Sequence, residues 1–288
     1  MSGFTLPSAS LLSQSILSGV FVGALYGLMG LGVSLSWGLL RLINLAHFAF
    51  AFLAAYLCYQ MATFGVDPLL TLFVIVPVFF ATGAGLHWVM ARFSVTPFNS
   101  LLLTFGLMGI AEAIIQTIWT ADFRKLESTY GQQKFKVGTL FVPVPELITL
   151  LLAVAISLAA WIVLRYTDLG KAMRAAAEDA AIASAFGVNE RRNALLLAGT
   201  CAALASIAGV CLALSFTLAP SQIYAWVGVF FAAVMLGGLG RALGPLIAGT
   251  VIGVSEAITM AVTAPSWAPI VSFTLLIVIL VLRPGKAA

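Results

Sequence analysis

The sequence predicts an all-α membrane protein, a polytopic helical bundle with eight or nine spans. Of its 288 residues, 62% are hydrophobic and only 8% are charged, whereas soluble domains carry about 25% charged residues. Several uncharged runs reach the roughly 20 apolar residues that one helix needs to cross a bilayer. Because so few charges could not cover a water-soluble surface, we expect lipid to surround most of this chain.

The N-terminal part contains four apolar runs, which predict four spanning helices. They cover residues 11–40, 44–63, 69–91 and 97–120. A polar stretch follows, and we expect residues 121–146 to form a loop outside the membrane. The first run is too long for the apolar core of a signal peptide, so we interpret it as a mature helix. The whole chain, residues 1–288, is expected to form a single transmembrane domain.

The C-terminal part contains five further runs, at 147–164, 193–216, 226–239, 243–262 and 267–282. The run at 226–239 is short for a bilayer and ends in glycines. It therefore either crosses the membrane or forms a broken or re-entrant helix.

The positive charges favour nine crossings. Basic residues remain mostly in cytoplasmic loops. With nine crossings, ten of the 14 Lys and Arg residues fall on the side of the C-terminus and of residues 165–192, and four fall on the other side. We therefore expect the C-terminus and the 165–192 segment in the cytoplasm, and the N-terminus and the 121–146 loop outside. A non-crossing 226–239 run would weaken this bias.

Several functional classes lack their signatures. No GxxxxGK[ST] phosphate loop and no GxSxG nucleophile elbow is present, so this chain is not expected to bind ATP or to be an enzyme. His47 and His87 are too far apart for a HExxH zinc site, and the basic residues form no nucleic-acid patch. The three cysteines lie singly in apolar runs, at Cys58, Cys201 and Cys211, so we expect no disulfide, metal or resident cofactor.

Glycines recur at four-residue spacing in two spans. They are Gly19, Gly23 and Gly27 in the first and Gly249 and Gly253 in a late one. Such faces let helix backbones approach closely in lipid. We expect a packing surface there, and a face beside a translocation path is the alternative.

The 165–192 segment predicts a short helix between two spans. Thr167 or Asp168 can cap its start, the alanine-rich stretch 171–186 favours helix, and Gly187 fits its end. Asn189 can cap the following span. This helix is either an inert interfacial loop or a docking surface for a cytoplasmic partner. The candidate docking residues are Arg174, Glu178, Asp179, Ile182, Phe186 and Gly187.

Four motifs resemble those of branched-chain amino-acid-type ABC permeases, the LivH/LivM group. They are GLLRLINLAH at 38–47, GKAMRAAAED followed by FGV at 170–188, VMLGGLG followed by GP at 234–245, and LRPG at 282–285. They occur in the family's order over nearly the whole chain. The 170–188 motif resembles the cytoplasmic coupling region of that family.

The resemblance implies a permease of the bacterial inner membrane. It implies a second, LivM-like permease subunit, two cytoplasmic ATPase subunits that hold the ATP and Mg, and a periplasmic substrate-binding protein. The implied substrates are small amino acids of the branched-chain type or related small organic solutes. Alternatives are urea, short amides or aromatic acids within the family, or an ion-coupled secondary transporter outside it.

Polar residues inside the spans are candidates for the translocation path, because ionisable groups in a membrane usually face a bundle interior or cavity. Glu112, Gln116 and Glu256 either line the path or form hydrogen bonds between helices. Asn44 and His47 either fix the turn before the second span or lie beside the path.

Aromatic bulk after His47 departs from the family pattern. Phe48, Phe50 and Phe52 follow that histidine, and only Phe48 and Phe52 share a helical face. They are expected to contact lipid or, alternatively, to line a more aromatic or apolar path.

Overall fold

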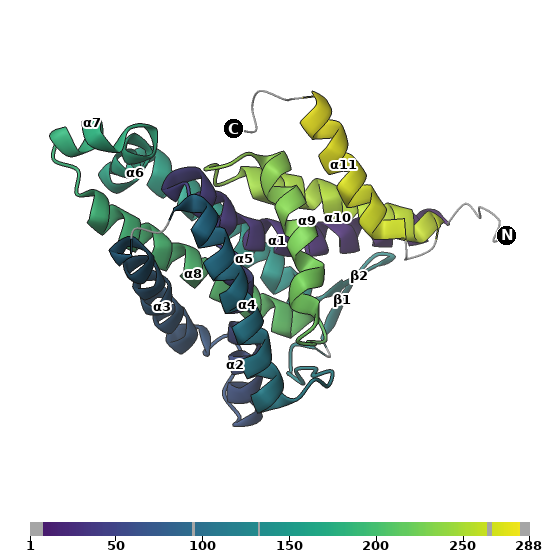
Figure 1. Ribbon diagram of the computed structural model, residues 1–288. Coiled ribbons are helices and arrows are strands. Elements are labelled where there is room, and N and C mark those ends of the chain that lie inside the picture. Colours follow the sequence, from purple (N-terminus) through teal and green to yellow (C-terminus); the bar gives the residue numbers. More distant parts are fainter. Residues whose placement is uncertain (1–7, 94–95, 132, 264–266, 283–288) are drawn as a thin grey trace.

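The computed structural model describes residues 8–93, 96–131, 133–263 and 267–282. The elements are α1 (Ala9–Leu40), α2 (Ala46–Thr63), α3 (Leu72–Arg92), α4 (Pro97–Trp119), β1 (Lys134–Val137), β2 (Leu140–Pro143), α5 (Val144–Tyr166), α6 (Asp168–Glu178), α7 (Ala180–Ala185), α8 (Glu190–Ser215), α9 (Gln222–Gly237), α10 (Gly244–Val262) and α11 (Ala268–Leu282). Figure 1 shows a helical bundle with α6 and α7 at one end and the β1–β2 hairpin at the other.

All nine apolar runs of the sequence form helices, with ends within a few residues of those expected. Within the described residues, six of these helices are long and apolar enough to cross a membrane, namely α1, α3, α4, α5, α8 and α10. The helices α2, α9 and α11 fall outside that set, so the expected count of eight or nine spans is not confirmed. The short helix α9 is continuous over 16 residues.

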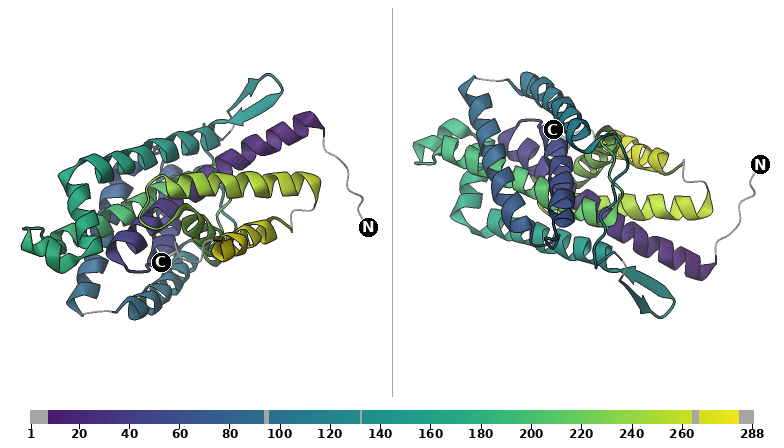
Figure 2. Two further views of the ribbon diagram at one scale, coloured as in Figure 1. Left: turned by 90° about the horizontal axis from the view of Figure 1, so that it is seen from above. Right: turned by 90° about the horizontal axis from the view of Figure 1, so that it is seen from below.

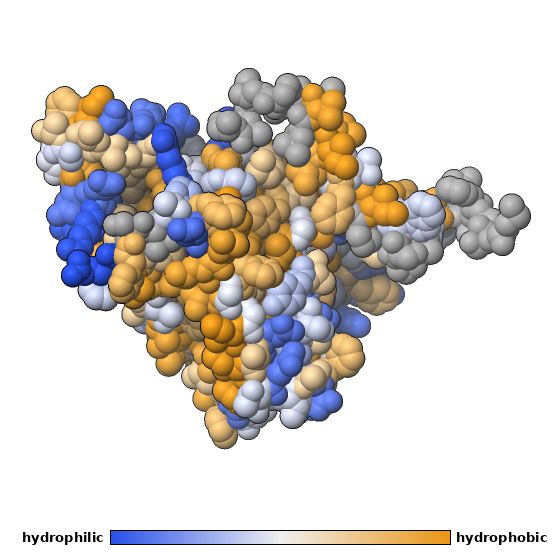
Figure 3. All heavy atoms as spheres, viewed as in Figure 1, coloured by the Kyte–Doolittle hydropathy of each residue, from blue (hydrophilic) through white to orange (hydrophobic). Residues whose placement is uncertain are grey.

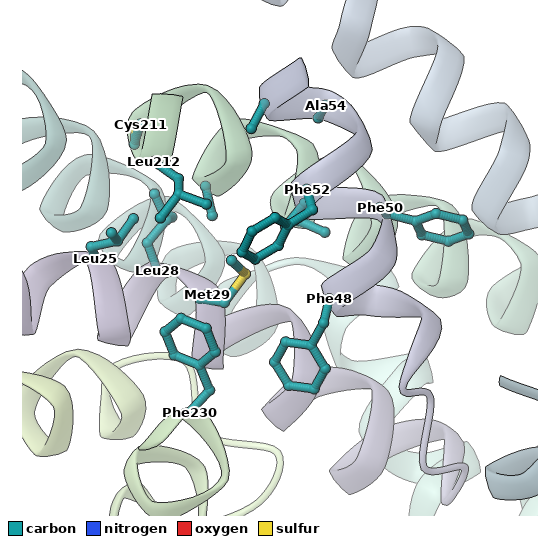
Figure 4. Close-up of a cluster of buried hydrophobic side chains, with 14 of the residues drawn as sticks. Leu25, Leu28, Met29, Phe48, Phe50, Phe52, Ala54, Cys211, Leu212 and Phe230 are labelled. Carbon is teal, nitrogen blue, oxygen red and sulfur yellow. The ribbon is translucent and has the colours of Figure 1, made fainter. Parts of the chain in front are cut away.

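Helix α1 lies at the centre of the bundle, between α5 and α10 (Figure 2). It also packs against α8 and α9, while α2 and α3 pack against α8. The core forms where α1, α2, α8 and α9 meet, and Figure 4 shows part of it. There Phe48 of α2 stacks on Phe230 of α9, with ring centroids 5.7 Å apart, beside Met29 of α1.

The glycine faces pack α1 directly against α10. The sequence predicted a packing surface on each helix, but not that the two surfaces would meet. A Cβ atom on Gly19 would lie 2.7 Å from the carbonyl oxygen of Gly253, and one on Gly23 would lie 2.5 Å from that of Gly249. Both distances are too short for a side chain, so glycine is required at these positions. Their packing role is confirmed.

Loops that lie far apart in the sequence meet at the hairpin end. Arg124 and Leu218 exchange two backbone hydrogen bonds of 2.9 and 2.7 Å. The Tyr130 hydroxyl donates to Asp67 at 2.7 Å, and this bond raises the pKa of the tyrosine. Gln14, near the start of α1, forms two 2.9 Å hydrogen bonds with the backbone of β2. Residues 121–131 and 133–146 therefore cover this end of the bundle.

The outer surface of the bundle is strongly apolar (Figure 3). Large apolar side chains are exposed on α3, α4, α5 and α10, whereas α1 and α8 are mostly buried. Examples of the exposed residues are Phe73, Val78, Phe98, Ile110, Ile114, Leu151, Leu158, Ile247 and Val251. Such a surface is typical of helices that face lipid or a membrane-embedded partner.

Candidate functional site

The 165–192 segment forms two helices, so the expectation of a single helix over 171–186 is wrong. Asp179 adopts an extended conformation (φ −149°, ψ 105°), and its carboxylate accepts a 2.9 Å hydrogen bond from the Ile182 amide. The side chain thus caps α7 and replaces a continuous helical turn. The other expected ends are confirmed. Thr167 caps α6, Gly187 has a φ of 87°, and Asn189 caps α8.

The proposed docking residues are exposed on α6 and α7. The side chains of Ile182 and Phe186 are 59% and 86% exposed, although both are apolar. The four remaining docking residues, Arg174, Glu178, Asp179 and Gly187, are also exposed. The structure therefore brings the predicted residues together on one projecting feature, which we call the α6–α7 projection.

The α6–α7 projection is attached to the bundle through α6. Gly170 packs against the backbone of Leu164 at the end of α5. Met173 is buried among bundle residues that include Leu197 of α8. The Arg41 guanidinium, just after α1, reaches the carbonyl oxygen of Glu178 at 3.5 Å. Displacement of α6 would therefore act on α1, α5 and α8.

Asn44 and His47 fix the start of α2. The Asn44 side chain accepts a 3.0 Å hydrogen bond from the Ala46 amide. His47 is 2% exposed, and its Nε2 lies 3.0 Å from the carbonyl oxygen of Met29 in α1. The His47 ring occupies the space that a side chain on Gly32 would need. This arrangement agrees with the prediction that both residues fix the turn before α2. A role beside the translocation path stays a prediction.

The phenylalanines of α2 do not contact lipid, and that expectation is wrong. Phe48 and Phe52 are each 1% exposed, and Phe50 is 9% exposed. Phe50 packs against Phe79 of α3, while Phe48 stacks on Phe230. Because α2 is surrounded by other helices, both of its aromatic faces are buried in the core.

Glu256 connects three helices. Its carboxylate, on α10, accepts a 2.9 Å hydrogen bond from the Tyr26 hydroxyl of α1 and another from the Ser272 hydroxyl of α11. It is 6% exposed and lines a cavity of about 370 Å³ together with Tyr26 and the aromatic rings of Trp226 and Phe216. The predicted hydrogen bonds between helices are confirmed. A role in the path stays a prediction.

Glu112 and Gln116 lie on the outer face of α4. Gln116 donates a 3.0 Å hydrogen bond to Glu112, and the Tyr224 hydroxyl of α9 lies close enough to interact with the same carboxyl group. The ring of Tyr224 also packs against Phe105, with centroids 6.2 Å apart. We call Glu112, Gln116 and Tyr224 the α4–α9 polar patch. It lies within an otherwise apolar surface.

The sequence identified Gln116 as a neighbour of Glu112, but it did not identify the partners of the two glutamates on other helices. Tyr26 and Tyr224 lie in apolar runs, and nothing in their spacing relates them to a glutamate on a distant helix. Ser272 lies on the next helix, 16 residues after Glu256, and the sequence does not show which faces of these two helices meet. These contacts come from the tertiary arrangement alone.

The described residues contain no group of three or more His, Cys, Asp or Glu side chains that could hold a metal ion. Cys58, Cys201 and Cys211 are free and buried. They pack in the cores of α2 and α8 as small apolar side chains.

The long apolar helices, the apolar outer surface and the polar projection define a multi-pass helical membrane protein. Comparison with known families makes the assignment specific. Residues 15–280 match the family described as "Branched-chain amino acid transport system / permease component". The chain belongs to this permease family.

Individual relatives agree with the family match. The permease protein LivH of the high-affinity branched-chain amino acid transport system of Salmonella typhimurium is 27% identical over 94% of this chain and 93% of its own length. BraD of Pseudomonas aeruginosa, from a system of the same description, is 24% identical over 94% of both chains. A probable LivH protein of Methanocaldococcus jannaschii is 28% identical over 85% of this chain and 80% of its own. No solved structure gave a significant match.

Proposed function

We propose that this chain is the membrane-spanning permease subunit of an ATP-driven importer in a bacterial inner membrane. It would translocate small amino acids of the branched-chain type, or related small organic solutes, delivered by a periplasmic binding protein. The relatives belong to branched-chain amino acid transport systems, which supports the proposed substrate class. The observation that carries the proposal is the α6–α7 projection, which exposes Ile182 and Phe186 at the polar end of an apolar bundle.

The α6–α7 projection would couple the bundle to ATP hydrolysis. The chain carries no phosphate loop of its own, so two cytoplasmic ATPase subunits would bind the ATP and Mg. Phe186 and Ile182 would enter a groove on an ATPase subunit, because exposed apolar side chains at a polar surface favour a protein partner. Movement of that groove would pass through α6 to α1, α5 and α8.

The α4–α9 polar patch would line the translocation path. Glu112 lies seven residues before the end of α4 at Trp119, about 10 Å along the helix axis. A carboxyl group at that depth is costly to expose to lipid. We therefore expect the patch to face water and a second, LivM-like permease subunit. Hydrophilic residues interrupt the apolar surface near the lower parts of α4 and α9 (Figure 3).

The charge distribution supports the orientation of the proposal. The α6–α7 projection and the C-terminus would be cytoplasmic, since ten of the 14 basic residues then lie on that side. The loops joined by Arg124, Leu218 and Tyr130 would face the periplasm. There they would form an ordered platform for the binding protein.

Crosslinking tests the coupling role. We would replace Ser184 on α7, which is exposed, with cysteine and use Phe135→Cys in the hairpin as the control, because its side chain is also exposed, at 56%. The Ser184→Cys variant is expected to crosslink to an ATPase subunit, in a manner that changes with ATP, and the control is not. A Ser184→Cys variant that never reaches an ATPase subunit in an assembled, active complex would contradict the proposal.

Reconstitution separates this function from an ion-coupled transporter. Proteoliposomes that contain both permeases and the binding protein should accumulate solute only when the ATPase subunits and ATP are present. Uptake by this chain without ATPase subunits would favour the secondary-transport alternative. A ligand survey of the partner binding protein would distinguish branched-chain amino acids from urea, short amides and aromatic acids.

A further inference from the structure

A cavity of about 390 Å³ lies between the α6–α7 projection and the bundle. Its walls come from the turn after α1, from α3, from α6 and from the start of α8, and Ser100 of α4 also contributes. This volume lies within the range of small-molecule sites, roughly 300–1,000 Å³. We call it the α6 cavity.

A positively charged group, a negatively charged group and a histidine line the α6 cavity. Arg41 contributes a guanidinium group, and Glu190, on the first turn of α8, contributes a carboxylate. His87 of α3 also lines the cavity, and its buried Nδ1 has no hydrogen-bond partner among the described residues. Because Nδ1 has almost no accessible surface, it does not face the cavity, and His87 contributes other atoms to the wall.

The remaining lining is mainly apolar. Met90, Met173 and Leu197 are all buried and contribute side chains from α3, α6 and α8. Flexible Met side chains adapt to ligands of slightly different shape. The α6 cavity therefore combines one basic residue, Arg41, two acidic residues, Glu178 and Glu190, and an adaptable apolar wall.

We infer that the α6 cavity binds a zwitterionic amino acid with a short aliphatic side chain. Arg41 holds the carboxylate, because a guanidinium group donates two hydrogen bonds to such a group. Glu190 accepts hydrogen bonds from the ammonium group. Met90, Met173 and Leu197 contact the aliphatic side chain.

Occupation of this cavity regulates the α6–α7 projection. Met173, Ala176, Ala177 and Glu178 of α6 form one wall of the cavity, so a bound amino acid holds α6 against the bundle. In the orientation proposed above, the cavity is on the cytoplasmic side. This regulatory consequence rests on the proposed function, and accumulated product would slow further import.

Direct binding tests the site without any partner. Purified full-length chain in detergent is titrated with L-leucine by calorimetry, and with two analogues of the same aliphatic shape. Leucinamide lacks the carboxylate, and 4-methylpentanoate lacks the ammonium group. We expect L-leucine to bind at least about tenfold more tightly than either analogue, since each leaves one charged group unpaired. Equal binding of the three compounds, or no binding of L-leucine, overturns the inference.

Matched variants assign the two charges. Arg41→Gln is expected to remove the preference for L-leucine over leucinamide, and Glu190→Gln the preference over 4-methylpentanoate. Lys125→Gln and Glu127→Gln serve as controls, because both residues are exposed in the 121–146 loop at the opposite end. Thermal unfolding of each variant shows that it is folded. Unchanged ligand preferences in folded Arg41→Gln and Glu190→Gln contradict the site.

Transport provides the separate test of regulation. L-leucine on the ATPase side of proteoliposomes should slow ATP-driven uptake by the wild type, and Glu190→Gln should be less inhibited. Equal inhibition of both proteins overturns the regulatory role. Absence of ATP-driven uptake in the assembled wild-type system would instead contradict the proposed function, and the binding titration would still decide the site.

Discussion

Glu256 is a carboxyl group in the interior of an apolar bundle, and two hydroxyl groups explain how it is accommodated. Tyr26 and Ser272 donate to its two oxygen atoms from two different helices. Buried polar groups are retained when their hydrogen bonds are satisfied. The residue therefore contributes to the relative placement of α1, α10 and α11.

Removal of the Tyr26 hydroxyl should destabilise the fold. We expect Tyr26→Phe to lower the free energy of unfolding by about 0.6 kcal/mol, the average for a hydrogen bond between membrane helices. Tyr56→Phe is the matched control, since the Tyr56 hydroxyl is buried without a partner among the described residues. Thermal unfolding in detergent measures both variants, and an equal effect of the two would contradict this role.

Glu112 differs from Glu256 because its environment is open. Glu112→Gln keeps the shape of the side chain and removes the charge. We expect solute uptake to fall by about threefold to tenfold with normal abundance in the membrane, because the proposed path loses its carboxylate. Thr82→Val, at an exposed position on the outer face of α3, is the control. Unchanged uptake by Glu112→Gln would show that its hydrogen bond to Gln116 is only structural.

The sequence identified the polar residues in the spans but not their environments. Asn44, His47 and Glu256 were recognisable as costly residues in apolar runs, and all three form specific hydrogen bonds. Whether such a residue faces a neighbouring helix or an open surface depends on contacts between distant segments. Phe48 was misjudged for the same reason, because apolar side chains suit lipid and core equally well.

At the scale of elements, the end of α7 depends on the backbone of Gly187. Its φ of 87° is inaccessible to proline, whose φ is fixed near −65°. We expect Gly187→Pro to reduce ATP-driven uptake to background while the protein stays in the membrane. Gly187→Asn should retain uptake, because asparagine tolerates the left-handed conformation. Normal uptake by the proline variant would contradict the coupling role of the α6–α7 projection.

A charge reversal tests the same projection without changing its backbone. Glu178 is exposed, and only its carbonyl oxygen contacts Arg41. Glu178→Arg should therefore leave the fold intact and lower uptake by about tenfold or more, since like charges at an interface oppose docking. Copurification of the ATPase subunits measures the docking. Undiminished copurification and uptake would exclude Glu178 from the interface.

The contact between α1 and α10 depends on glycine residues, which have no side chain to separate the two backbones. Gly23→Leu would force the two backbones apart and should destabilise the bundle by about 3 kcal/mol. Gly85→Leu is the control, because nothing lies within 4 Å of a Cβ atom on Gly85. Thermal unfolding and abundance in the membrane should separate the two variants. Equal stability would contradict the close approach of α1 and α10.

Helix positions were predictable because apolar length and caps are local properties of the sequence. Thr167, Gly187 and Asn189 marked their helix ends correctly. The break at Asp179 was not predicted, since alanines on both sides favour a continuous helix. Asp179 instead caps α7, and such a cap contributes about 0.5–2 kcal/mol relative to alanine.

At the scale of the whole molecule, the order of helices along the chain does not reveal their neighbours. Side chains that face lipid and side chains in the core are both apolar, so polarity does not show which side of a helix is buried. The glycine spacing of α1 and α10 indicated that each helix has a close-packing face, but not that these two faces would pair. The central position of α1 and the meeting of Arg124 with Leu218 required the structure.

The pairing of α1 with α10 also has a consequence for synthesis. Tyr26 of α1 and Glu256 of α10 are separated by 230 residues. A ribosome that adds 5–20 residues per second therefore completes α10 about 10–50 s after α1. During that interval the translocon or surrounding lipid must cover the glycine face of α1 that later packs against α10. The central helix α1 is therefore synthesised first, but its contact with α10 forms only near the end of synthesis.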